Sequence, residues 1–142
     1  MGALIFEKTG KTPHVHLDID VPIFEIKGPS FSEMSVEIFN PIIEWVEENV
    51  SKLDKELVCE LHFDILNSVS HKKVFQTILA LNEHVKKGKN IKIKWLFDSN
   101  DEDIEEMGED LLDLIEIPFD LEPIENDYDD DDDDDSWKAG IF

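Results

Sequence analysis

Short segments with alternating apolar and polar residues are separated in this chain by longer amphipathic segments. Strict alternation puts successive side chains on opposite faces of a strand, whereas apolar residues at three- and four-residue spacing mark one face of a helix. The two patterns follow each other in the order strand, strand, helix, strand, helix, strand, helix, strand. The five expected strands lie within residues 14–20, 24–27, 57–66, 91–97 and 118–121, and the three helices within about 33–49, 74–86 and 104–114.

This order of elements restricts the fold to a small set. A strand, helix and strand in series form a parallel crossover, and right-handed crossovers place the helices together on one side of the sheet. Most of the strands carry one polar face, whereas a sheet buried on both faces would have continuous apolar strands. We therefore expect an α/β fold: a two-layer domain over residues 1–123, with a mixed sheet of about five strands and three helices mainly on one face. The open face would present His16, Asp18, Glu25, Lys27, Glu60, His62, Asp64, Lys92 and Lys94.

Three local signals refine this expectation. Ser30 and Glu33 have the spacing of a capping box, in which both side chains satisfy backbone amides at a helix start. Pro41 has no amide hydrogen, so we expect a kink near Asn40 or a second helix start there. On the open face, Lys92 or Lys94 could pair with Glu60 or Asp64 across neighbouring strands.

The formal net charge of −22 is concentrated at the C-terminal end. Residues 1–100 carry a net charge of −3, whereas residues 101–142 carry −19 and include the seven consecutive acids Asp129–Asp135. Since the chain has no Arg and this excess of acids, nucleic acid and anionic membranes are poor partners. We expect residues 124–142 to form a disordered acidic tail. As an alternative, Trp137, Ile141 and Phe142 would form a calcium-sensitive docking motif on that tail.

Features that usually mark an enzyme or a metal protein are missing from the sequence. There is no Gly-rich phosphate loop, nucleophile elbow or paired acid and base. His14 and His16 have no third ligand, and the acidic segment 98–103 lacks the sixth-position Gly of an EF-hand. The lone Cys59 excludes an internal disulfide and is expected to be buried and inert. We therefore expect no enzymatic activity, metal or cofactor. Without a signal peptide or an apolar run of about 18 residues, a cytoplasmic location is expected.

The segment between the third expected strand and its helix, residues 67–72, is the most informative for function. A hydroxyl at this position meets unpaired helix amides and the positive end of the helix dipole. A phosphate on Ser68 or Ser70 would gain charge-assisted hydrogen bonds there, with Lys72 and Lys73 close behind. The structural alternative is that Ser68 or Ser70 simply caps the helix, which serine does very commonly.

The segment Asn67-Ser68-Val69-Ser70-His71-Lys72 resembles the Asn-Thr-Ser-Ser-x-Lys segment of the SiaC-type regulatory phosphoproteins, bacterial relatives in architecture of the STAS anti-sigma-factor antagonists. Further segments resemble that family in the same order, from about residue 12 to 121. They are Thr12-Pro13, Gly28-Pro29-Ser30-Phe31-Ser32-Glu33, Phe39-Asn40-Pro41-Ile42 with Trp45, Trp95-Leu96-Phe97-Asp98, Asp101-Glu102-Asp103, Gly108-Glu109-Asp110 and Pro118-Phe119. Ser68, Val69, Ser32 and Met34 depart from the family's Thr, Ser, Pro and Asn at those positions.

The resemblance implies a partner-switching signalling protein with a STAS-like fold. In the family, a kinase with a histidine-kinase-like ATPase fold phosphorylates the residue after the asparagine, and a PPM-type phosphatase reverses the reaction. The unphosphorylated form binds and activates a diguanylate cyclase, which raises cyclic di-GMP and favours aggregation or biofilm. Carried over by position, the phosphorylated residue is Ser68, with Ser70 as second choice. Its surroundings are Asn67, Val69, His71 and Lys72.

Two other classes of function remain open on the sequence. A scaffold independent of phosphorylation would bind partners through the open sheet face and the acidic tail, and would depend on Lys92 and Lys94. An enzyme with an unrecognised site would depend on a polar cluster such as His16, His62 and Asp64.

Overall fold

The computed structural model describes residues 3–31, 33 and 35–124 of the chain. The elements follow in the order β1 (Leu4–Phe6), β2 (His14–Asp18), β3 (Ile23–Ser30), α1 (Ser35–Asn49), the short 3₁₀ helix η1 (Val50–Lys52), β4 (Leu57–Leu66), α2 (Ser68–Lys86), β5 (Ile91–Asp98), α3 (Glu102–Leu112) and β6 (Phe119–Ile124). In the described part of the chain, none of the helices combines the length and the apolar character needed to cross a bilayer.

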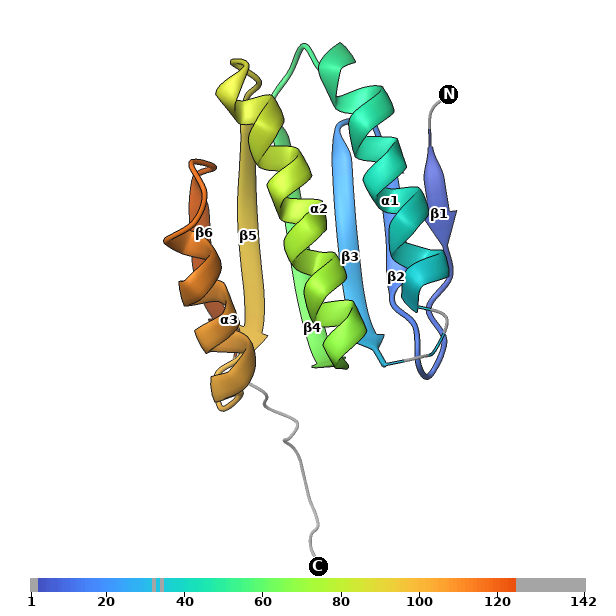
Figure 1. Cartoon of the computed structure of the whole chain (residues 1–142), viewed down its shortest axis with the longest axis vertical. Coiled ribbons are helices and arrows are strands. Elements are labelled where there is room, and N and C mark those ends of the chain that lie inside the picture. Colours follow the sequence, from blue (N-terminus) through green and yellow to red (C-terminus); the bar gives the residue numbers. More distant parts are fainter. Residues whose placement is uncertain (1–2, 32, 34, 125–142) are drawn as a thin grey trace, which may run out of the picture.

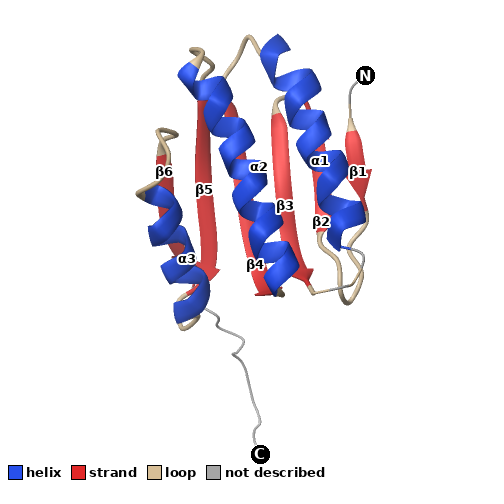
Figure 2. Cartoon of the chain, viewed as in Figure 1, coloured by secondary structure: helices blue, strands red, loops and turns tan. Residues whose placement is uncertain are grey.

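The strands form one mixed sheet whose spatial order, β1 to β6, is the order of the chain. The pairs β1–β2 and β2–β3 are antiparallel, and the pairs from β3 to β6 are parallel. All three α-helices cover the same face of this sheet (Figures 1 and 2). The two-layer α/β fold expected from the order of elements is thus confirmed.

One strand was not expected from the sequence. The three residues of β1 pair with β2, with Leu4 opposite Leu17 and Phe6 opposite Val15, and they make a sixth strand at the edge of the sheet. Three residues are too few to establish an alternating pattern, so the pairing with β2 is what defines the strand.

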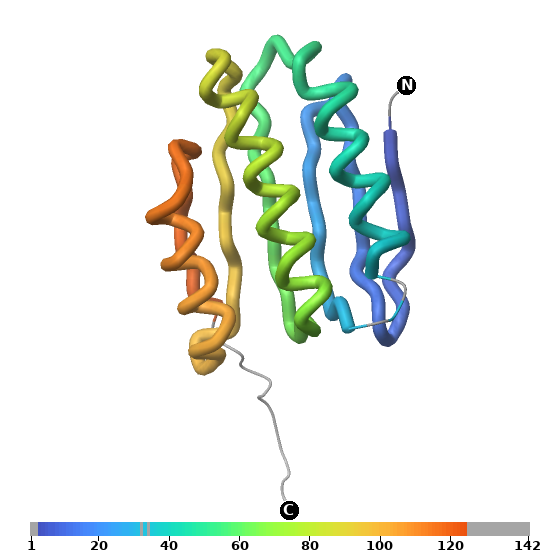
Figure 3. Tube along the Cα trace, in the orientation of Figure 1, coloured from blue at the N-terminus to red at the C-terminus, as the bar shows by residue number. Residues whose placement is uncertain are grey.

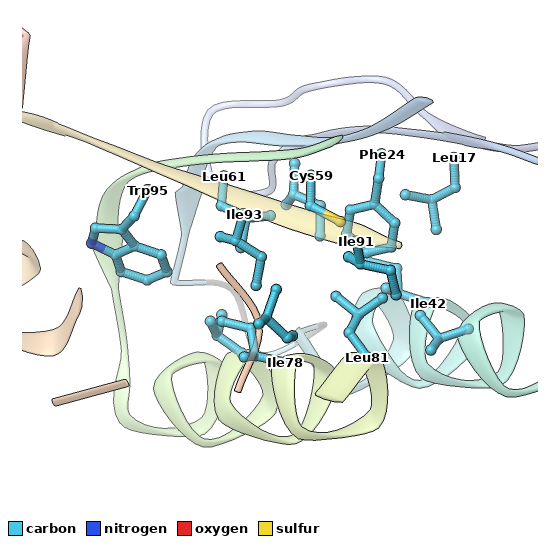
Figure 4. Packing of buried hydrophobic residues seen from close by; sticks show 14 of the residues in the cluster. Leu17, Phe24, Ile42, Cys59, Leu61, Ile78, Leu81, Ile91, Ile93 and Trp95 are labelled. Atoms are coloured by element: carbon cyan, nitrogen blue, oxygen red, sulfur yellow. The ribbon is translucent and has the colours of Figure 1, made fainter. Parts of the chain in front are cut away.

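The core lies between the sheet and the helices (Figure 4). It contains Leu17, Phe24, Leu61, Ile93 and Trp95 from the strands and Ile42, Ile78 and Leu81 from the helices, all at most 1% exposed. The alternation in 57–66 and the helical spacing in 104–114 place Ile65 and Leu114 on the apolar faces, but they are exposed by 55% and 63%. Ile65 falls where the pairing of β3 with β4 becomes irregular, between Gly28 and Ser30, and Leu114 lies two residues beyond the last residue of α3.

The start of the first helix differs from the sequence expectation. Ser30 is the last residue of β3 and α1 begins at Ser35, so the predicted capping box at Ser30 and Glu33 is wrong. Pro41 lies inside α1, which continues through it to Asn49 as one coil (Figure 3). The second helix start considered near Asn40 is therefore absent. The hydrogen bond that Pro41 cannot make would reach the carbonyl of the exposed Glu37, where water can take its place.

Ion pairs on the open face of the sheet join neighbouring strands. Lys27 Nζ lies 2.9 Å from Glu60 Oε1, and Lys92 Nζ lies 3.1 Å from Asp120 Oδ2. The hydrogen bond and charge of Asp120 raise the pKa of Lys92. Lys92 therefore does not make the predicted pair with Glu60 or Asp64, whereas Lys94, the other lysine considered, lies opposite Glu60 in the register of β4 with β5. Glu60 is taken by Lys27 on β3, and Lys92 reaches β6 on the other side.

The expected acidic tail, residues 124–142, lies outside the described residues except for Ile124, the last residue of β6. The alternative docking motif at Trp137, Ile141 and Phe142 lies outside them as well.

Candidate functional site

The C-terminal ends of β3, β4 and β5 lie at one end of the sheet, and α1, α2 and α3 all begin at this same end (Figure 1). Asn67 links two of these ends. Its backbone amide donates to the Ser30 carbonyl oxygen at 3.1 Å, which joins the end of β3 to the turn that follows β4. Residues 67–72, singled out from the sequence, therefore lie where strand ends and helix starts converge.

Asn67 caps α2. Its side-chain Oδ1 accepts a hydrogen bond from the Ser70 amide at 2.8 Å, and its carbonyl accepts the first bond of the helix, from the His71 amide at 2.9 Å. Asn67 has the extended backbone that is typical of a cap residue. The structural alternative, in which Ser68 or Ser70 caps the helix, is therefore wrong.

Ser68 is the first residue of α2, and its side chain is exposed. In the first turn of a helix the backbone amides have no partner within the helix. Asn67 accepts from the Ser70 amide, and the amides of Ser68 and Val69 precede it in the same turn. A phosphate on Ser68 would therefore lie beside the first backbone amides of the helix, at the positive end of the helix dipole.

The two lysines expected near Ser68 are placed differently. Lys72 is exposed and follows Ser68 by four residues, which puts both on the same helix face. Lys73 donates from Nζ to Asn40 Oδ1 of α1 at 2.8 Å. Of the two, Lys72 is therefore the cation on the same helix face as Ser68.

Ser70, the second choice for the phosphorylated residue, is fully buried. Its hydroxyl lies 2.7 Å from Ser30 Oγ and 2.7 Å from Ser35 Oγ, and these two side chains are each 1% exposed. Ser70 is thus enclosed in a cluster of three hydroxyls, the serine cluster, and no modifying enzyme can reach it in this conformation. Among residues 67–72, Ser68 is the serine with the access that modification requires.

Sequence reasoning missed the roles of Ser30 and Ser35. The spacing of Ser30 and Glu33 indicates a helix cap, but spacing alone cannot show which contact a side chain makes in the folded chain. The burial of Ser70 has a signal in the sequence: it precedes Val74 by four residues, which places it on the same helix face as that buried residue. Ser68 is off that face.

A groove of about 500 Å³ reaches the first turn of α2 at His71. Its acidic lining residues come from the end of β4 and from α3 and the turn before it: Asp64, Asp101, Asp103, Glu106 and Asp110. The exposed His71 ring packs edge-on against Phe75, with 5.2 Å between ring centroids. A dianion on Ser68 would be repelled by the groove and attracted by the amides of its own helix turn.

Exposed apolar side chains also lie at this end of the sheet. They are Phe31 after β3, Val36 in the first turn of α1, Ile65 near the end of β4 and Val69 beside Ser68, with exposed fractions of 38%, 39%, 55% and 45%. We call these four residues together with Ser68 the junction surface. Side chains of this kind are typical of a protein-binding surface when polar residues surround them.

The other candidates from the sequence have structural explanations. Asp101 caps α3, accepting from the Ile104 amide at 3.2 Å. Cys59 is buried in the core, and burial raises the pKa of its thiol. His14 lies 3.5 Å from Glu25, and residues 3–31, 33 and 35–124 contain no cluster of three potential metal ligands. His62 lies 3.9 Å from Asp64 and 3.7 Å from Asp98 on the open face. His16, the third member of the polar cluster considered for an enzyme, lies on β2, across β3 from His62.

The chain is similar to known proteins over nearly the whole described part. The model of the SiaC family of regulatory phosphoproteins matches residues 6–124. An uncharacterized protein of Pseudomonas aeruginosa strain UCBPP-PA14 is 27% identical over 119 residues, which cover 84% of this chain and 94% of that protein.

Solved structures agree with this match. Apo-SiaC from Pseudomonas aeruginosa superposes with a TM-score of 0.78 at 25% identity, covering 86% of this chain and 99% of the other. A chain of the crystal structure of the diguanylate cyclase SiaD in complex with its activator SiaC, from the same organism, superposes with a TM-score of 0.79 at 26% identity. That match covers 85% of this chain and 99% of the other.

Proposed function

This chain belongs to the SiaC family of regulatory phosphoproteins, and from this premise we propose that it is a reversible signalling switch. In its unphosphorylated form it binds and activates a diguanylate cyclase through the junction surface. Phosphorylation of Ser68 releases that enzyme. The chain acts in the cytoplasm of a bacterium and carries out no catalysis itself. Its output is the cyclic di-GMP made by the cyclase, which controls aggregation or biofilm.

The observation that carries this proposal is the contrast between Ser68 and Ser70. Ser68 is exposed at the first turn of α2, and Ser70 is fully buried two residues later. A kinase can therefore reach one hydroxyl of the turn and not the other. Ser68 is the first residue of α2, so a phosphate on it would lie beside backbone amides of the first turn, which have no acceptor within the helix. The helix dipole adds about 0.3–1 kcal/mol at an exposed site of this kind.

The junction surface explains why phosphorylation would block docking. A partner that covers Phe31, Val36, Ile65 and Val69 also covers Ser68, which lies in sequence beside Val69. A phosphoserine carries a charge of about −1.5 to −2 at pH 7. Removing such a charge from water under an apolar contact costs several kcal/mol unless the partner supplies cations. A loss of more than tenfold in affinity is expected, because tenfold corresponds to about 1.4 kcal/mol.

The identity of the partners is proposed from relatives. The similar SiaC of Pseudomonas aeruginosa is the activator in a solved complex with the diguanylate cyclase SiaD, which supports a cyclase as the partner here. The resemblance of residues 67–72 to the family's phosphorylated segment supports a kinase with a histidine-kinase-like ATPase fold and a PPM-type phosphatase as the two opposing enzymes.

The test compares three forms of the full chain for binding to a diguanylate cyclase. They are the wild type, Ser68→Ala, and the chain with phosphoserine incorporated at position 68; the probes are SiaD of Pseudomonas aeruginosa and the cyclase captured from the native host. Wild type and Ser68→Ala should bind with similar affinity, and the phosphoserine form should bind at least tenfold more weakly. The matched control places phosphoserine at position 51, an exposed serine in η1.

Two results would contradict the proposal. One is equal cyclase affinity for the unmodified form and the form with phosphoserine at 68. The other is the consistent absence of phosphate from Ser68 in protein purified from its host under several growth conditions. In that case a scaffold acting through the open face would be favoured, and its binding would depend on Lys92 and Lys94.

A further inference from the structure

Three buried hydroxyls join three elements behind the junction surface. Ser30 ends β3, Ser35 begins α1, and Ser70 lies in the first turn of α2. The Ser70 hydroxyl is the centre of the cluster, because it lies 2.7 Å from each of the other two. The first turn of α2 is thus tied by one side chain to the end of a strand and to the start of the neighbouring helix.

Apolar packing does not explain this cluster. Alanine would fill nearly the same space without hydroxyls that need partners after burial. Hydrogen bonds differ from apolar contacts in fixing the distance and direction between the groups they join, and a fully satisfied buried network specifies one arrangement of its elements. The backbone of this turn is held as well, because Asn67 Oδ1 accepts from the Ser70 amide and the Asn67 amide donates to the Ser30 carbonyl.

The serine cluster connects the two halves of the junction surface, Phe31 and Val36 on one side and Ile65, Ser68 and Val69 on the other. Phe31 and Val36 follow Ser30 and Ser35 directly in the chain, and Val69 directly precedes Ser70. The relative position of the two halves therefore depends on how the start of α1 is held against the start of α2.

We propose that Ser70 is a positioning residue, whose buried hydroxyl fixes the start of α1 against the first turn of α2 so that the junction surface around Ser68 has one shape. Ser70 does not touch the partner; it acts through Ser30 and Ser35. This inference rests on the proposed function for its consequence, partner binding, but its physical content is the linkage of the two helix starts. Loss of the hydroxyl lets the two halves move independently while the core between α1, α2 and the sheet stays packed.

The first experiment measures the linkage without any partner. Amide hydrogen exchange is followed in the full chain at Phe39 and Asn40, whose helix acceptors are the carbonyls of Ser35 and Val36. Ser70→Ala should speed exchange at both amides at least threefold. The matched control is Thr77→Val, which removes another buried hydroxyl of α2, one that donates to the Lys73 carbonyl of its own helix at 2.8 Å. This control should leave exchange at Phe39 and Asn40 unchanged.

A second variant separates linkage from general loss of stability. Ser35→Ala removes the partner of the same hydrogen bond, so the effects of the two substitutions on exchange should be less than additive in the double variant Ser35→Ala/Ser70→Ala. Additive effects would show that the two hydroxyls act separately and would overturn the proposal. Equal acceleration by Thr77→Val would overturn it too.

The consequence for binding is measured with the diguanylate cyclase SiaD as probe. Ser70→Ala should lower cyclase affinity about tenfold, with the Thr77→Val control close to wild type. Faster exchange with unchanged cyclase affinity would overturn the positioning role. If the wild type itself does not bind a cyclase, the proposed function fails, and the exchange results at Phe39 and Asn40 decide the role of Ser70 without it.

Discussion

Replacing Gly108 by alanine should destabilise the fold, although alanine is the better helix former. Gly108 is a buried residue of α3. A Cβ added there would lie 2.5 Å from Leu121 Cδ2, 2.6 Å from Trp95 Cδ1 and 2.7 Å from Trp95 Nε1. Helix α3 therefore approaches β5 and β6 so closely that no side chain fits between them. In an open position the same change would stabilise a helix by up to about 1 kcal/mol.

The expected magnitude follows from three contributions. Overpacking in a well-packed core costs about 1–3 kcal/mol. The Trp95 ring must move, which weakens the hydrogen bond from Trp95 Nε1 to the Ile104 carbonyl, now 2.9 Å, at a cost of about 0.5–1.5 kcal/mol. The gain in helix propensity offsets part of this sum. We expect a net loss of about 1–3 kcal/mol in the free energy of unfolding.

Urea denaturation followed by far-ultraviolet circular dichroism measures this change directly. The matched control is Glu109→Ala, an exposed position next to Gly108 on the same helix, which should change the free energy of unfolding by less than about 0.5 kcal/mol. A Gly108→Ala chain as stable as the wild type, or more stable, would refute the tight contact between α3 and the Trp95 ring.

Three further predictions concern the cap, a histidine and the cysteine. Asn67→Ala removes the cap of α2 and should cost about 0.5–2 kcal/mol in urea denaturation, whereas Asn67→Asp keeps an acceptor for the Ser70 amide and should restore most of that loss. Burial, followed by the nearby charges of Lys87 and Lys89, lowers the pKa of His84 below its usual 6.5. The unfolded chain therefore binds this proton more readily, so the stability owed to neutral His84 is full above about pH 6.5 and is lost as the pH falls through the lowered pKa. His84→Gln should flatten the fall in stability below pH 6.5, and an unchanged pH dependence would contradict the assignment. Cys59 should react with a thiol reagent only after denaturant is added, because it is fully buried with a raised pKa; rapid labelling of the native chain would argue otherwise.

Much of the fold could be predicted from the sequence because its strands have one polar face. The alternation from Leu57 to Leu66 gave both bounds of β4 as the structure has them. Local patterns failed where contacts between distant segments decide the outcome. The Ser30 hydroxyl bonds to a residue 40 positions away, and the spacing from Ser30 to Glu33 carries no information on that contact. Strand β1 exists because β2 offers it a partner, and its three residues show no pattern of their own.

The candidate site was predicted at the level of the segment and not at the level of roles. The sequence singles out residues 67–72, but serine is a common cap residue, so the pattern does not distinguish capping of α2 from modification. The structure shows that Asn67 caps α2, that Ser68 is exposed and that Ser70 is buried. Side-chain exposure depends on which helix face meets the core, and this is fixed by the packing of α2 against its neighbours.

The two outer strands of the sheet bear on how this protein can meet others. Strand β1 offers only three residues, and β6 carries Pro123, which has no amide hydrogen, together with the charges of Asp120 and Glu122. Short, charged or proline-containing edges discourage a further strand from another molecule. Sheet extension, a frequent route to both peptide capture and aggregation, is therefore disfavoured at either side. The proposed docking at the end of the sheet, beside Ser68, makes no use of either outer strand.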